Sequence, residues 1–107
     1  MTDDDLNMAL AEALSLWTTT VKQRNGELVS ATHEPPAFTT DGNAMPALID
    51  AMRKRGYAAR YWSGPQIPHS CIFFNNTAGL EEIGADADMF PRAVAEAAAK
   101  ALGVWEE

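Results

Sequence analysis

The fold is decided by residues 39–63, which read TTDGNAMPALIDAMRKRGYAARYWS. Apolar side chains in this stretch repeat at the i, i+3, i+4, i+7 spacing of an amphipathic helix: Met45, Leu48, Ile49 and Met52. Pro46 fits the first turn, where its missing N–H is not needed, and this favours Asn43 as the N-cap. Gly56 supplies the left-handed residue that ends helices, and a strand follows over residues 57–63.

Length and composition indicate one domain over residues 1–107, with 47% hydrophobic and 21% charged residues. No apolar run approaches the ~20 residues of a membrane span, and the acidic start MTDDDLNMAL is unlike a secretory signal. The single cysteine, Cys71, excludes an internal disulfide and fits a reducing compartment. We therefore expect a cytoplasmic protein. Its net charge of −7 disfavours general nucleic-acid binding.

The remaining elements follow from periodicity and turn residues. Thr2 or Asp3 caps a first helix whose apolar face runs to Trp17. Asn25-Gly26 predicts a tight hairpin turn between strands at 18–23 and 28–31. A fourth strand is expected at 69–75 and a loop at 76–87. A last helix opens at Asp88 or Phe90, with Pro91 in its first turn, and stops at Gly103. Trp105, in the tail, is expected to dock on its own domain or on a second copy.

The strand at residues 69–75 has apolar side chains on both faces, with Ile72 and Phe74 on one and Cys71 and Phe73 on the other. Strands that are apolar on both faces are typically covered on both. The sequence thus predicts an α+β fold in the order helix-strand-strand-helix-strand-strand-helix. A mostly antiparallel four-stranded sheet is expected, with helices packed on its faces.

Several segments, spread over roughly the whole chain, are similar to those of a known family: AEALSLW, PPAFTTDGNAMPAL, RKRGY, the apolar strand, and MFPRAVAEAAAKAL. With these features the sequence resembles the phage ABA-sandwich domain, found in small bacteriophage and prophage proteins. The resemblance implies a phage origin and a layered fold, and it brings no catalytic residues with it. Proteins of this size and origin often act by binding a defence protein or a nucleotide signal in the infected cell.

Candidate chemical groups are few. His33-Glu34 and His69-x-Cys71 match no metal-ligand spacing, so we expect no metal. Apolar neighbours favour an inert Cys71 over a nucleophile. Asp86 and Asp88 precede a helix, where carboxylates usually cap. Residues 39–43 start a helix and could hold an anion, but Asp41 already places a carboxylate there, so capping is favoured. We expect no cofactor and no enzymatic activity.

Basic residues alternate with aromatic ones near the end of the central helix, in an otherwise acidic chain: Arg53, Arg55, Tyr57, Arg60, Tyr61 and Trp62, with Lys54 between them. Cations beside stacking surfaces suit a nucleotide or phosphorylated ligand. The competing interpretation is that the charges solvate the helix end while the aromatics pack. Two hypotheses follow. The protein binds a host defence protein or a phage protein, or it sequesters a signalling nucleotide through residues 53–62. Both allow a homo-oligomer.

Overall fold

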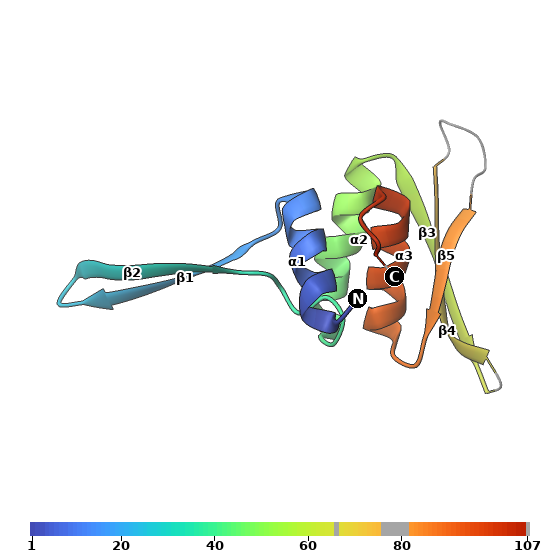
Figure 1. The fold of residues 1–107 in the computed structure, drawn as a ribbon, viewed down its shortest axis with the longest axis horizontal. Helices are drawn as coiled ribbons and strands as arrows, with labels where there is room; N and C mark the ends of the chain where they lie inside the picture. The colour runs from blue at the N-terminus through green and yellow to red at the C-terminus, as the bar shows by residue number, and fades with distance from the viewer. Residues whose placement is uncertain (66, 76–81, 107) are drawn as a thin grey trace.

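A computed structural model of the chain describes residues 1–65, 67–75 and 82–106 and shows an α+β fold (Figure 1). The elements in chain order are α1 (Asp3–Leu14), β1 (Thr18–Arg24), β2 (Glu27–Glu34), the 3-10 helix η1 (Gly42–Ala44), α2 (Met45–Lys54), β3 (Tyr57–Gly64), β4 (Ile67–Asn75), β5 (Glu82–Ala87) and α3 (Phe90–Leu102).

The strands form two separate antiparallel sheets. β3, β4 and β5 make one sheet in that order, and β1 and β2 pair only with each other as a hairpin. The prediction of a single four-stranded sheet is therefore wrong. β5 was predicted as loop, although Ile83, Ala85 and Ala87 alternate with polar or glycine positions as in a strand. Small and acidic residues have low β propensity, which hid this alternation. Residues 76–81 of the expected loop lie outside the described residues.

The core lies between one face of the sheet and the three helices. α3 packs on β4 and β5, α2 packs on β3, and α1 packs on α3. The largest fully buried side chains include Leu6, Leu10, Phe38, Leu48, Met52, Phe73 and Val94. Alanines cover much of α3 and are buried as well, which allows close approach of neighbouring elements. Apolar burial on this one face holds the domain together.

The prediction of helices on both faces of the sheet is also wrong. Figure 1 shows all three helices on the same side. Cys71 and Phe73 face them and are buried, whereas Ile72 and Phe74 point to the other face and are half-buried. Neighbouring side chains give that face its partial cover: the Arg60 guanidinium carbon lies 5.9 Å from the centre of the Phe74 ring. Side chains of the sheet itself thus cover Phe74 on this face, in place of a second layer of helices.

Helix ends follow local rules with one exception. Thr2 caps α1 by accepting a hydrogen bond from the Asp5 amide at 3.1 Å. Gly56 and Gly103 have φ of 94° and 76° and follow α2 and α3, as expected. The prediction that Asn43 caps the central helix is wrong. The Asp41 carboxylate accepts from the Asn43 amide at 2.9 Å and starts η1, which leads directly into α2.

Arg92 joins the two ends of the chain. Its guanidinium donates to Asp3 at 2.5 Å, to Glu96 at 2.7 Å and to the Met1 carbonyl at 3.0 Å. Its terminal carbon also lies 5.9 Å from the centre of the Trp105 ring. Trp105 thus docks on its own domain, which is one of the two outcomes expected from the sequence. One partly buried cation therefore holds α1, α3 and the tail together.

Arg92→Met should lower the free energy of unfolding by about 1–3 kcal/mol, because it leaves the shielded Glu96 carboxylate without its partner. The Arg92 and Glu96 side chains are only 20% and 16% exposed. Lys54→Met is the matched control, since Lys54 and Asp50 form a pair of the same spacing that is 77% and 54% exposed. That change should cost less than about 0.5 kcal/mol in urea denaturation. Equal losses for the two variants would contradict a stabilising role of the partly buried Arg92 contacts.

Candidate functional site

The basic and aromatic residues singled out in the sequence do not form one group. Strand alternation places Tyr57 and Tyr61 on the helix side of β3, and Arg60 and Trp62 on the opposite face. Arg53 lies on α2, on the same side of the sheet as the two tyrosines. The structure thus brings together three of the six residues and places two of the others behind the sheet.

Two of the six make contacts within the fold. The Arg55 guanidinium donates to the Ala13 carbonyl at 2.7 Å, close to the C-terminal end of α1, where a cation is favoured. The Tyr57 hydroxyl donates to the Ala101 carbonyl at 3.2 Å, near the end of α3. These contacts tie α2 and β3 to the other two helices. Both side chains therefore have a structural role. Tyr57 packs as the competing interpretation proposed, whereas Arg55 binds the end of α1 and not the end of its own helix.

A groove runs between α2 and β3. It consists of two adjoining hollows of about 490 and 510 Å³ that share Ile49 and Tyr61. The residues lining the first are Ile49, Arg53, Gly56, Tyr57, Ala58, Ala59 and Tyr61, and those lining the second are Gly42, Met45, Pro46, Ile49, Tyr61 and Phe90. Among these described lining residues, Arg53 is the only one with a charged side chain. We call this feature the α2–β3 groove.

The edge of the sheet beside the groove is open. In the described sheet β3 has one partner strand, β4, so its other edge has backbone amides and carbonyls that no strand pairs. Gly56, Ala58 and Ala59 line the groove there, and their small size leaves the backbone reachable. The opposite edge strand, β5, instead carries exposed Glu82 and Asp86. Charged side chains commonly protect an edge. On β3 the charged side chain is Arg60, which lies on the face of the sheet opposite the groove, so the groove side of the β3 edge is the one suited to pairing.

An aromatic cluster closes one end of the groove. The Tyr61 and Phe90 rings meet edge to face, with their centroids 5.4 Å apart. Phe90 also contacts His69, and the centroids of these two rings are 4.9 Å apart. Phe90 is the first residue of α3, far from α2 and β3 in sequence. Sequence reasoning assigned Met45 and Ile49 to the apolar stripe of the central helix and Phe90 to the start of the last helix. It missed their role in the groove because only the tertiary structure places them beside Tyr61.

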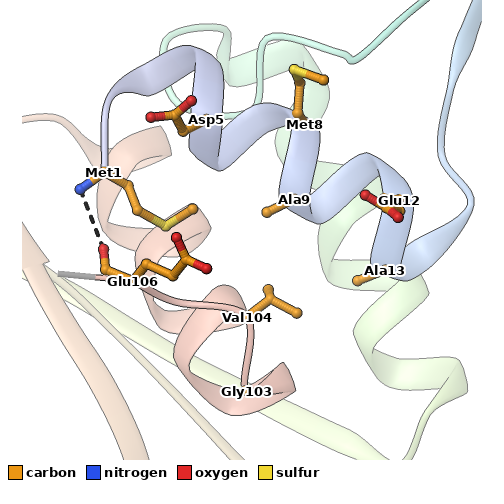
Figure 2. Close-up of a pocket in the computed structure, with 9 residues that line it drawn as sticks. All are labelled: Met1, Asp5, Met8, Ala9, Glu12, Ala13, Gly103, Val104 and Glu106. Atoms are coloured by element: carbon orange, nitrogen blue, oxygen red, sulfur yellow. Dashed lines mark hydrogen bonds between the residues drawn. The ribbon is translucent and has the colours of Figure 1, made fainter.

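A larger cleft lies between α1 and the C-terminal tail, with a volume of about 760 Å³ (Figure 2). Its lining includes the carboxylates of Asp5, Glu12 and Glu106 and the half-exposed side chain of Met8. The Met1 nitrogen donates to the Glu106 carbonyl at 3.4 Å across one end. The described lining contains no aromatic side chain and no strand edge. This cleft therefore provides a binding partner with fewer favourable contacts than the α2–β3 groove does.

The other candidate groups have structural surroundings. Cys71 is fully buried, and burial raises the pKa of its thiol from 9.0 to about 12. His69 shares the same strand face, as expected, and lies against Phe90. Asp86 accepts a hydrogen bond from the buried Ser70 hydroxyl of the neighbouring strand. Within the described residues, no three His, Cys, Asp or Glu side chains are grouped to hold a metal ion.

Comparison of the chain with protein-family models, curated proteins and solved structures finds no match. The resemblance to the phage ABA-sandwich domain therefore stays a prediction from the sequence. Across the described ranges of the chain, none of the helices has the length and hydrophobicity needed to cross a bilayer.

Cys71 should react with Ellman's reagent at least ~100-fold more slowly in the native protein than in concentrated urea, because reaction requires opening of the core. The folded thiol keeps its proton up to about pH 12, whereas the unfolded thiol ionises near 9.0. Because the native protein reacts through its opened state, whose thiol ionises near 9.0, labelling of both forms should accelerate as the pH rises from 8 to 10. The same shift should lower stability as the pH rises above 9.0. Rapid labelling of the native protein near pH 8 would contradict this burial.

Proposed function

We propose that this protein acts by binding another protein, and that the α2–β3 groove accepts an extended segment of that partner. The segment adds as a strand to the open edge of β3 and lies beside α2. The observation that carries the proposal is the position of an unpaired strand edge directly against an apolar groove. Strand addition beside a helix is a common mode of peptide recognition, in which backbone hydrogen bonds provide much of the affinity.

The groove defines the chemistry of the segment. Alternate side chains of an added strand point to the same face, so every second residue faces α2. An aromatic or long aliphatic side chain suits the hollow between Met45, Tyr61 and Phe90, which is lined mainly by apolar groups. Arg53 lines the adjoining hollow and favours an acidic side chain nearby. The expected ligand is therefore an extended segment with an apolar anchor and an acidic residue near Arg53.

The resemblance to the phage family and the single cysteine bear on which protein supplies the segment and in which compartment it binds. The phage origin that the resemblance implies would make a host defence protein or a phage protein the natural partner. A single buried cysteine fits a reducing cytosol, which supports a cytoplasmic place of action. The nucleotide alternative loses support because Arg60 and Trp62 lie on the face opposite Arg53 and Tyr61. No single groove contains all six residues on which that hypothesis rested.

The test compares Arg53→Glu with Arg60→Glu. Both arginines are exposed and both changes alter the net charge equally, but only Arg53 lines the groove. Peptides selected from a random displayed library should contain an apolar anchor and acidic residues. Fluorescence anisotropy with a selected peptide should show about tenfold weaker binding to Arg53→Glu, which corresponds to ~1.4 kcal/mol. Arg60→Glu should bind within about twofold of the unchanged protein.

Two results would count against strand addition in the groove. The first is a selection that enriches no peptide, and the second is an equal loss of affinity in both arginine variants.

The nucleotide hypothesis is tested by measuring the melting temperature of the protein with a panel of nucleotides. A ligand present at 100 times its Kd adds ~2.7 kcal/mol of stability and raises the melting temperature. Such a rise that is lost in both Arg60→Ala and Trp62→Ala would favour the nucleotide function.

A further inference from the structure

The connection between α2 and β3 closes one end of the α2–β3 groove. α2 ends at Lys54 and β3 begins at Tyr57, so only Arg55 and Gly56 separate the helix from the strand. Figure 1 shows the chain passing directly from α2 to β3 at this end. Gly56 lines the groove there, together with Arg53 and Tyr57. A strand bound along β3 therefore meets the backbone of the connection at this point and cannot continue.

The other end of the groove is bounded only by side chains. So short a connection reverses the chain, and the start of α2 accordingly lies beside the later part of β3. Met45 and Pro46 of α2 line the same hollow as Tyr61 of β3. At that end the chain continues from β3 to β4 and reaches α2 from η1, so it does not join the two walls of the groove. A bound segment can enter past the rings of Tyr61 and Phe90.

Arg53 lies at the closed end without an acidic partner. It is exposed and forms no salt bridge with another described residue. Its neighbours differ, because Lys54 pairs with Asp50 and Arg55 donates to the Ala13 carbonyl. The carbonyls at the end of α2 carry a negative charge of about half a unit, which three consecutive basic residues outweigh. The Arg53 guanidinium is therefore available to bind an anion.

We propose that the groove binds the C-terminal tail of its partner, with the terminal carboxylate at Arg53. This inference rests on the strand addition proposed above and specifies which kind of segment adds. A segment that cannot pass the connection ends there and presents one of its two termini. The positive charge of Arg53 attracts a terminal carboxylate and repels a terminal amine. The guanidinium also suits a carboxylate in shape, because it can donate two parallel hydrogen bonds to it.

The position of the carboxylate sets the direction of the bound segment. β3 runs from Tyr57 at the closed end towards Tyr61 at the aromatic end. A segment whose last residue lies beside Tyr57 therefore runs antiparallel to β3. Antiparallel pairing is slightly more stable per residue than parallel pairing, and β3 already pairs with β4 in this way. The charge of Arg53 and the geometry of the backbone thus favour the same direction.

The same alignment places the apolar anchor of the segment. Tyr57 and Tyr61 are four residues apart in the strand, a span of roughly 13 Å. The hollow between Met45, Tyr61 and Phe90 therefore lies beside the residue about four positions before the end of the segment. Side chains at even spacing share a face, so this residue and the last one both face α2. We expect an aromatic or long aliphatic side chain at that position.

Peptides displayed with a free C-terminus test the proposal. Short random peptides of this kind should yield binders that carry an apolar residue about four positions before the end. A selected peptide is then synthesised with a free carboxylate, with a C-terminal amide, and with a Gly-Ser extension. Fluorescence anisotropy should show about tenfold weaker binding of the amide, which loses the charge-assisted hydrogen bonds. The extended peptide should lose at least as much, because the connection obstructs it.

Two protein variants locate the carboxylate. Arg53→Gln should remove most of the difference in affinity between the acid and the amide, whereas Arg60→Gln should retain it. Both arginines are exposed, but Arg60 lies on the face of the sheet opposite the groove. Neither side chain forms a salt bridge within the described part of the chain, so both variants should melt close to the unchanged protein.

The outcomes separate this inference from the function on which it rests. Equal affinities of the acid, the amide and the extended peptide would overturn recognition of a C-terminus and leave strand addition in the groove intact. An acid–amide difference that Arg53→Gln retains, or that Arg60→Gln removes equally, would also overturn it. A selection that enriches no peptide, whether its C-terminus is free or joined to the carrier, would contradict the groove function and this inference together.

Discussion

The close packing of α3 against the sheet is the constraint on which the rest of the structure depends. α3 contacts β4 and β5 on one side and the other two helices elsewhere, and six of its residues are buried. Alanine makes this possible, because it has no rotamer to order on burial and lets neighbouring elements approach closely. The position of α3 in turn sets Phe90 at the end of the groove and Arg92 between α1 and the tail. A single helix of small residues thus places both features.

Packing on only one face decides where the molecule can interact. Three helices on the same side bury the inner face of the sheet, and the side chains of the other face shield one another. A three-stranded sheet necessarily has two edges close to any point on it. Acidic side chains occupy the β5 edge, whereas small residues leave the β3 edge reachable beside α2. The candidate site therefore lies at the margin of the sheet and not in a cleft within the core.

The sequence alone determined the local features. The Asn25-Gly26 turn, the stops at Gly56 and Gly103 and the start of α1 at Thr2 depend on backbone preferences of a few neighbouring residues. It also pointed to Arg53, Tyr57 and Tyr61. Only the tertiary structure decided which strands share a sheet, that β5 exists, that the helices lie on one face, and that Phe90 completes the groove. These depend on contacts between residues distant in the chain, which residue patterns do not encode.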